Sequence, residues 1–270
     1  MARIYGSNRV VGTVGGIRHY RLPGCDFIVA AEKGGASKEL IKNNPAFART
    51  RENNEEWKGV TKLAKQVKIS FGLDAATVVN RFLIGALNKA MLTALRRNPL
   101  EYRGQRSIFL SAHKDVLDAI VYYYYKPFKD VMHCRFEVDT GPDRKSMSVR
   151  LTNLIPKEQI KAPGEATHFQ LFLHLGVVCD LVFDLDNNYY REVYDGRYHS
   201  GSGKTFLTDW IPIDAGSMGD LTLTAELSED YPLKDDMTVT RCFGITFGKM
   251  MSKVEELKKN RGSIEFLGAV

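Results

Sequence analysis

Residues 51–68 carry apolar residues at helical spacing. Between residues 51 and 68 they recur every three or four positions, and charged residues occupy the opposite side. This pattern is typical of an amphipathic helix with one side against the core. The apolar side consists of Trp57, Val60, Leu63, Ala64 and Val67.

Three further signals extend this helical region. Asn44 followed by Pro45 indicates a helix start, because Asn caps exposed N–H groups and Pro fits the first helical position. Residues 74–97 predict a second helix that is apolar around most of its circumference and therefore buried. Residues 112–125 predict a third, which Pro127 ends or kinks.

Residues 9–31 predict a β-hairpin. The sequence Leu22-Pro23-Gly24-Cys25 fits a type II turn, since Gly accepts a positive φ at the third position. Three glycines in the first strand, Gly12, Gly15 and Gly16, predict a bulge or a close backbone approach.

From residue 132 the hydrophobic pattern changes to a period of two. Short strands separated by turn residues indicate a sandwich or barrel. A charged helix over residues 249–259 and a last apolar strand over 264–270 are expected to close the chain. The other predicted strands are residues 134–139, 147–152, 169–175, 177–183, 189–194, 205–211, 221–227 and 239–246.

These elements predict an α+β protein with an N-terminal β-hairpin, a helical layer and a C-terminal antiparallel β-sandwich. The expected segments are an N-terminal hairpin arm over residues 1–36, a helical region over 37–131, and a sandwich domain with a terminal helix and strand over 132–270. A chain of 270 residues is long enough to bury an ample core without disulfides.

Charge is distributed unevenly along the chain. The formal net charge is +6, yet residues 1–100 carry +10 and residues 151–250 carry −7. Such asymmetry favours binding to nucleic acid, or head-to-tail association with an oppositely charged partner.

The cysteines and the N-terminus favour a cytoplasmic protein. Four cysteines, Cys25, Cys134, Cys179 and Cys242, lie too far apart for a CxxC motif and are expected to be reduced, mostly buried thiols. No signal peptide is visible, because the N-terminus has no apolar h-region. Residues 75–95 are too polar for a membrane span, so no membrane association is expected.

Two short motifs resemble ligand sites but lack required residues. Gly201 to Thr205 resembles a P-loop, but Tyr198 stands where the first glycine is required, and a strand is expected after Lys204. The oxygen-rich run from Asp184 to Asn188 resembles a calcium loop, but Tyr189 replaces the loop's glycine. We therefore expect a flexible loop in the first case and a polar hairpin tip in the second.

No combination of residues indicates catalysis. The six histidines form neither HxH nor HExxH, and GxSxG is absent. We therefore expect no catalytic residues, no cofactor, no metal ligands and no enzymatic activity.

The basic side of the residue 51–68 helix is the best candidate contact surface. It consists of Arg51, Lys58, Lys62 and Lys65, with Glu55 among them. A solvated helix face, a protein contact and a phosphate contact all fit this arrangement.

The order of parts resembles a family of uncharacterised Bacteroidota proteins of this size. The matching pieces are residues 11–16, with sequence Val-Gly-Thr-Val-Gly-Gly, residues 44–49, and the strands after residue 165. The resemblance spans most of the chain and implies this fold, with no activity and no site residues. The tyrosine-rich middle and the 249–259 segment depart from the family pattern.

Together these features favour a non-enzymatic structural protein that self-assembles into a filament, tube or other homo-oligomeric particle. Terminal β segments and oppositely charged halves would hold neighbouring copies together. The hairpin requires a surface to dock on, either in its own chain or on a neighbour. The alternative is a nucleic-acid-associated protein that binds phosphate weakly and non-specifically through its basic N-terminal half.

Overall fold

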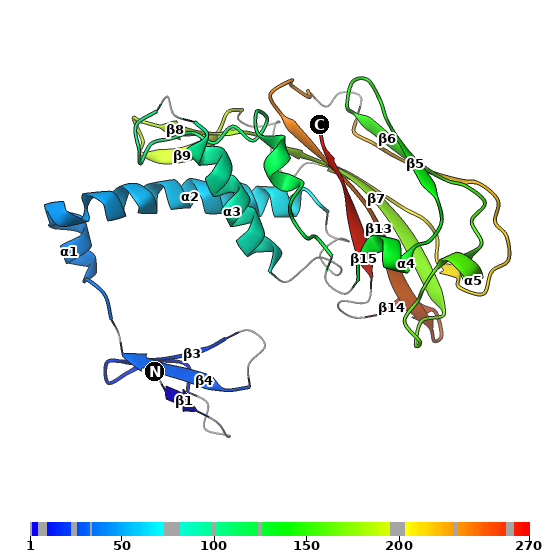
Figure 1. Cartoon of the computed structure of the whole chain (residues 1–270), viewed down its shortest axis with the longest axis horizontal. Helices are drawn as coiled ribbons and strands as arrows, with labels where there is room; N and C mark the ends of the chain where they lie inside the picture. The colour runs from blue at the N-terminus through cyan, green and yellow to red at the C-terminus, as the bar shows by residue number, and fades with distance from the viewer. Residues whose placement is uncertain are drawn as a thin grey trace. The chain divides into compact units, whose positions relative to one another are not determined.

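The structure is a computed structural model (Figure 1), in which the chain divides after Arg51 into two compact units, Met1–Arg51 and Glu52–Val270. The fold is α+β, with an N-terminal hairpin, a helical layer and a C-terminal antiparallel β-sandwich, as the sequence predicts. The helices after residue 51 thus belong to the same unit as the sandwich. The residues described are 2–4, 10–22, 26–32, 34–72, 82–98, 101–123, 126–194, 203–228, 232–257 and 262–270.

The N-terminal unit is a small antiparallel sheet followed by short helices. Its strand order is β1-β4-β3-β2. The strands are β1 (Ala2–Ile4), β2 (Gly12–Val14), β3 (Ile17–Arg21) and β4 (Ile28–Glu32), and the helices are α1 (Lys38–Asn43) and the 3₁₀ helix η1 (Pro45–Phe47).

The predicted first strand of the hairpin is in fact two strands. Gly15 and Gly16, with φ of 57° and 82°, form a tight turn between Val14 and Ile17, which pair across it. Two successive residues with positive φ suit a two-residue β-turn, and glycine reaches that region without strain. The bulge prediction is therefore wrong for these two glycines. The predicted turn at Pro23-Gly24-Cys25 lies outside the described residues.

The helix start at Asn44 is confirmed. The Asn44 side chain accepts a hydrogen bond from the backbone N–H of Ala46 at 2.9 Å, with Pro45 as the first helical residue. Ser37 caps α1 similarly, accepting from Leu40 at 3.1 Å.

The predicted helix over residues 51–68 is confirmed as part of α2, and the second predicted helix forms over its described part as α3. The prediction that this second helix is buried is wrong over that part, because Ile84, Gly85, Lys89 and Thr93 are exposed and only one side packs against the core. The third is wrong: between residues 112 and 123 only one 3₁₀ turn forms. There the buried Tyr122 packs its ring 4.6 Å from that of Phe266 and 5.2 Å from that of Phe71, which holds the segment against the core. The helices are α2 (Ala48–Ile69), α3 (Leu83–Arg96), η3 (Lys114–Leu117), α4 (Phe128–Val131) and α5 (Pro156–Gln159).

Two antiparallel sheets form the sandwich. The larger has the order β10-β7-β13-β14, with β11 also paired to β7 and β15 to β13, and the smaller has the order β12-β6-β5. A separate hairpin pairs β8 with β9. The strands are β5 (Phe136–Thr140), β6 (Ser146–Leu151), β7 (His168–Val178), β8 (Leu181–Asp184), β9 (Tyr189–Glu192), β10 (Gly203–Leu207), β11 (Ile211–Pro212), β12 (Leu221–Glu226), β13 (Thr238–Met250), β14 (Val254–Glu256) and β15 (Ser263–Ala269).

Strand β7 continues where the sequence predicts a break. It passes through Gly176 and pairs with β13 from His168 to Val178. A Cβ atom at Gly176 would collide with the backbone carbonyl of Ser70, just beyond the end of α2. The glycine therefore permits a close approach between helix and strand rather than ending the strand.

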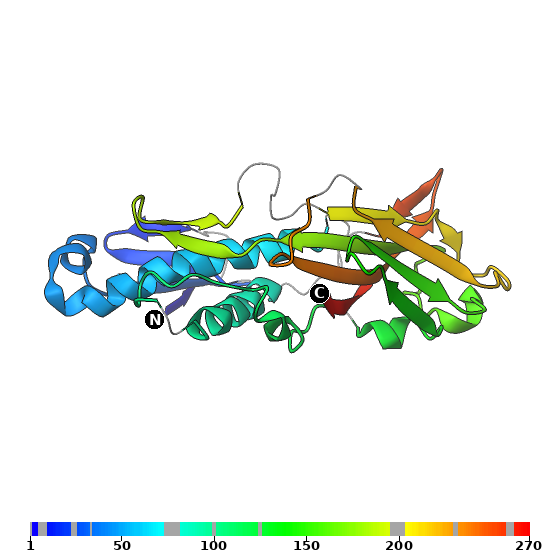
Figure 2. The same ribbon diagram turned by 90° about the horizontal axis from the view of Figure 1, so that it is seen from above.

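Two hydrophobic cores meet on β7. Leu171, Leu173 and Leu175 belong to the core between the two sheets, whereas Phe172 and Val178 belong to the core beneath α2 and α3. Both views show these helices at one end of the sheets (Figures 1 and 2). Alternation along a strand thus lets β7 serve both cores.

The predicted terminal helix over residues 249–259 is wrong. Residues 249–257 contain the end of β13, a turn and β14, and residues 258 and 259 lie outside the described residues. Lys249 lies directly opposite Glu255 on the paired strand. Opposite charges in this position favour a hairpin, although the spacing of the charged residues along the sequence is typical of a helix.

The close approach at Gly176 generates a stability prediction. The substitution Gly176→Ala is expected to lower the free energy of unfolding by about 1–3 kcal/mol, because backbone atoms of Ser70 cannot move aside cheaply. Urea unfolding followed by circular dichroism measures this loss.

Gly85→Ala provides the control. Gly85 is exposed in α3, and a Cβ there would meet nothing within 4 Å. We expect this change to raise the free energy of unfolding by up to about 1 kcal/mol, because Ala is the better helix former. Equal effects of the two substitutions would contradict the account of Gly176.

Candidate functional site

The predicted basic contact surface is not a free stripe of four cations. The Arg51 guanidinium donates to the backbone carbonyls of Ile41 and Asn44, at 2.8 and 2.9 Å. These bonds occupy the carbonyl groups at the end of α1 and just after it, so Arg51 has a structural role within the N-terminal unit.

Of the three lysines, two also have partners. Lys58 pairs with Glu55 at 2.6 Å on the surface, and Lys62 donates to the backbone carbonyl of Tyr190 at 2.8 Å. Lys65 is exposed and makes no hydrogen bond or ion pair with any other described residue. The proposed phosphate or partner contact thus retains one uncommitted cation on this helix.

The P-loop-like segment is a strand where it is described. Gly203, Lys204 and Thr205 lie in β10 and pair with β7, so the flexible-loop prediction is wrong for these residues, because hydrogen bonding to β7 extends the strand to Gly203. Thr205 shares a 2.6 Å hydrogen bond with His174. Tyr198, Gly201 and Ser202 lie outside the described residues.

The oxygen-rich run at Asp184 is a hairpin tip between β8 and β9. The Asp184 carboxylate accepts hydrogen bonds from the backbone N–H groups of Asp186 and Asn187, and lies 3.5 Å from Arg191. Asn188 has a positive φ of 54°. The polar-tip prediction is confirmed, because the carboxylate stabilises the turn itself.

The described cysteines and potential metal ligands do not form a candidate site. Cys134, Cys179 and Cys242 are buried thiols that form no disulfide with another described residue, while Cys25 lies outside the described residues. Burial raises the pKa of the Cys242 thiol far above its usual value, so it stays protonated. Among the described residues no three His, Cys, Asp or Glu side chains are placed to hold a metal ion.

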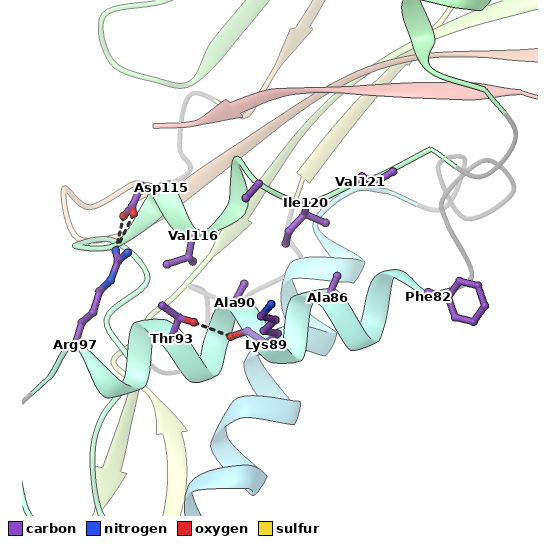
Figure 3. Close-up of a pocket in the computed structure, with 11 residues that line it drawn as sticks. Phe82, Ala86, Lys89, Ala90, Thr93, Arg97, Asp115, Val116, Ile120 and Val121 are labelled. Atoms are coloured by element: carbon purple, nitrogen blue, oxygen red, sulfur yellow. Dashed lines mark hydrogen bonds and ion pairs between the residues drawn. The ribbon is translucent and has the colours of Figure 1, made fainter.

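An apolar groove of about 580 Å³ runs along α3 (Figure 3). Ala86 and Ala90 line it from the helix, and Val116 and Ile120 line it from the segment that contains η3. Most of the lining is apolar, so the groove mainly offers apolar contact area, and its polar lining residues are Lys89, Thr93, Arg97 and Asp115.

Two features mark the ends of this groove. Phe82 is 63% exposed at one end, and Arg97 pairs with both oxygens of Asp115 at 2.8 Å toward the other (Figure 3). The hydrogen bond from Arg97 lowers the pKa of Asp115, which keeps this exposed pair ionised.

A second cavity, of about 460 Å³, is rich in arginine. Arg96 comes from α3, Arg103 and Arg106 come from the following segment, and Asn53 and Trp57 come from α2. Trp57 was predicted on the apolar side of its helix, but it is 47% exposed and lines this cavity instead. Sequence reasoning missed the arginines because they belong to no motif and converge only through folding.

A buried carboxylate organises this arginine cavity. Glu56 is 3% exposed and accepts hydrogen bonds from Arg106 Nε at 2.7 Å, Arg106 Nη2 at 2.9 Å and the Gly104 backbone N–H at 2.8 Å. Desolvation opposes ionisation of Glu56, but these hydrogen bonds and the positive charges of Arg106 and Arg103 outweigh it and lower its pKa.

The N-terminal sheet presents exposed aliphatic side chains. Val14 is 58% exposed and Ile17 is 42% exposed, and the two lie directly opposite each other on β2 and β3. Of the residues between 10 and 51 whose burial is described, only Ile28 and Val29 are buried. The sequence shows where these aliphatic residues are, but it does not predict that they lie exposed on a sheet of one layer.

Comparison of the chain with protein-family models, with curated proteins and with solved structures gives no match. Within the described part of the chain, no helix is both long enough and apolar enough to cross a membrane.

The Glu56–Arg106 pair generates a prediction on stability and pH. Glu56→Gln removes the carboxylate charge and leaves the half-buried Arg106 without its counter-ion, so we expect a loss of about 3 kcal/mol in the free energy of unfolding at pH 7. Since the folded-state pKa of Glu56 lies below the usual 4.5, its stabilising contribution is present above that value. It is lost as the pH falls through the folded pKa. Urea unfolding at pH 7 and about pH 3 measures how far the difference in free energy of unfolding between the unmodified and Glu56→Gln proteins narrows at low pH.

Glu55→Gln is the matched control on the same helix. It removes the exposed pair with Lys58, and we expect a change of less than about 1 kcal/mol. Equal free energies of unfolding for the Glu56→Gln and Glu55→Gln proteins at pH 7 would show that the buried Glu56–Arg106 pair does not stabilise the fold.

Proposed function

We propose that this protein is a non-enzymatic structural subunit that assembles with copies of itself into a filament, tube or other homo-oligomeric particle. The observation that supports this most directly is the N-terminal sheet, on which Val14 and Ile17 are exposed. A single sheet that exposes aliphatic side chains gains stability when another layer covers them. In the proposed assembly a neighbouring copy supplies this layer.

Charge favours a second copy as the partner. Residues 1–51 contain nine Lys and Arg against three Asp and Glu, a formal charge of +6. Residues 132–270 contain 16 Lys and Arg against 21 Asp and Glu, a formal charge of −5. The N-terminal unit of one copy is therefore attracted to the sandwich of another, while like parts repel each other.

Strand β5 is the part of the sandwich that best fits this role. It lies at the edge of the three-stranded sheet, where one side of its backbone has no strand partner among the described residues. Glu137 and Asp139 on this strand are exposed, and so is Val138 between them. An acidic, partly apolar edge suits a basic sheet with exposed aliphatic side chains.

Such a contact joins two different surfaces of the same molecule. A contact of this kind closes into a ring if the rotation between copies allows it, and otherwise continues as a filament or tube. The proposal thus includes both outcomes and excludes a symmetric dimer through like surfaces.

The alternative is a nucleic-acid-associated protein that binds phosphate groups through the basic N-terminal half. The charge of +6 on residues 1–51 supports it. Arg51, Lys58 and Lys62 weigh against it, because each already bonds within the chain. We therefore place it second, as weak and non-specific binding.

The combined substitution Val14→Thr with Ile17→Thr tests the proposal. It keeps the charge and the β-branched side chains but makes the exposed pair less apolar. We expect the protein concentration at which oligomers form to rise at least about tenfold, which corresponds to roughly 1.4 kcal/mol. Sedimentation velocity over a concentration series measures this, and higher salt should also weaken assembly.

Leu185→Thr provides the control, because Leu185 is an exposed aliphatic residue on the β8–β9 hairpin tip. Its assembly should match that of the unmodified protein. The proposal fails if the full chain stays monomeric at high concentration and moderate salt. Association that requires added nucleic acid would favour the alternative.

A further inference from the structure

The arginine cavity between α2, α3 and residues 101–108 carries one more positive charge than the two carboxylates beside it balance. Three guanidinium groups line it, those of Arg96, Arg103 and Arg106, together with the carboxylate of Glu56, and the carboxylate of Glu52 lies 3.6 Å from Arg103. Like charges gathered around one cavity repel each other, so an anion there lowers the energy of the arrangement.

The three arginines differ in how far they are already engaged. Glu56 neutralises Arg106 through two hydrogen bonds. Arg103 donates to the neutral side chain of Asn53 at 2.7 Å and lies 3.6 Å from Glu52. Arg96 is exposed and makes no hydrogen bond or ion pair with any other described residue. Arg96 and Arg103 therefore have donors available for a ligand.

The cavity is also held in shape before any ligand enters. Glu56 bonds both Arg106 and the backbone N–H of Gly104, which fixes the segment that carries Arg103. Gly104 has a φ of 92° and lies close to Glu52, so this turn fits tightly on α2. A fixed turn reduces the entropy that a ligand must overcome on binding.

The lining indicates the chemical class of the ligand. Arginine offers a planar fork of donors that matches phosphate oxygens. The indole of Trp57 lines the same cavity and offers a surface against which a planar ring can pack. A volume of about 460 Å³ is within the usual range for small-molecule sites.

We infer that this cavity binds a small phosphate ester attached to a planar ring, such as a nucleoside monophosphate. Arg96 and Arg103 hold the phosphate, and Trp57 packs against the ring. This inference concerns binding alone and goes beyond the proposed assembly, which uses the N-terminal unit and β5.

Calorimetric titration of the full chain tests the inference, with AMP, adenosine and inorganic phosphate as separate probes. We expect saturable binding of AMP with a Kd of about 1 mM or tighter, and binding of the other two at least about tenfold weaker. Adenosine lacks the phosphate, and inorganic phosphate lacks the ring.

Substitutions assign the binding to this cavity. Arg96→Gln and Arg103→Gln should each weaken AMP binding at least about tenfold, because each removes a charged donor. Both residues are exposed, so folding should be unaffected, and thermal unfolding checks this. Trp57→Leu should weaken AMP binding but leave inorganic phosphate binding unchanged.

Arg97→Gln is the matched control, since Arg97 follows Arg96 in the chain but lines the apolar groove of Figure 3 instead. Its affinity for AMP should stay within about twofold of the unmodified protein. The inference is overturned if AMP does not bind saturably, if Arg96→Gln and Arg103→Gln leave its affinity unchanged, or if inorganic phosphate binds as tightly as AMP.

Discussion

The pairing of β7 with β13 is the interaction on which the C-terminal unit depends. The two strands pair continuously from His168 to Val178, and side chains from both enter the core between the sheets and the core beneath the helices. Gly176 lets the end of α2 reach this ladder, and the Thr240 hydroxyl joins it to Ser70 at 2.9 Å. The helices after residue 51 and the sandwich therefore form one compact unit.

The N-terminal unit, by contrast, has little hydrophobic core. It consists of a sheet with a tight turn at Gly15 and Gly16 followed by capped helices, and of its residues between 10 and 51 whose burial is described only Ile28 and Val29 are buried. A unit with so little core gains stability by covering its exposed aliphatic side chains. In the proposed assembly, the charge of +6 attracts this unit to the acidic sandwich of a second copy. The proposed assembly follows from this contrast between the two units.

The sequence predicts the fold class and most strands, because alternation over four or more residues is a strong local signal. It fails where long-range contacts decide. Gly176 suggests the end of a strand, but its close contact with Ser70 explains why a glycine lies within a continuous strand. The charge pattern around Lys249 suggests a helix, but Lys249 lies opposite Glu255 in a hairpin. The arginine cavity is invisible for the same reason, since Glu56 and Arg106 are 50 residues apart in the chain. Val14 and Ile17 are exposed because no second layer among the described residues of the N-terminal unit covers them, and the local pattern does not encode this.

Amide hydrogen exchange measured over a range of protein concentrations tests the central claim most directly, because it reads the N-terminal sheet residue by residue. If neighbouring copies cover this sheet, protection of the amides in β2, β3 and β4 rises with protein concentration and falls with added salt. Amides in the middle of β7 and β13 stay equally protected throughout, because their pairing lies within one chain. Protection in β2 to β4 that does not change with concentration, in a range where oligomers form, would contradict the account.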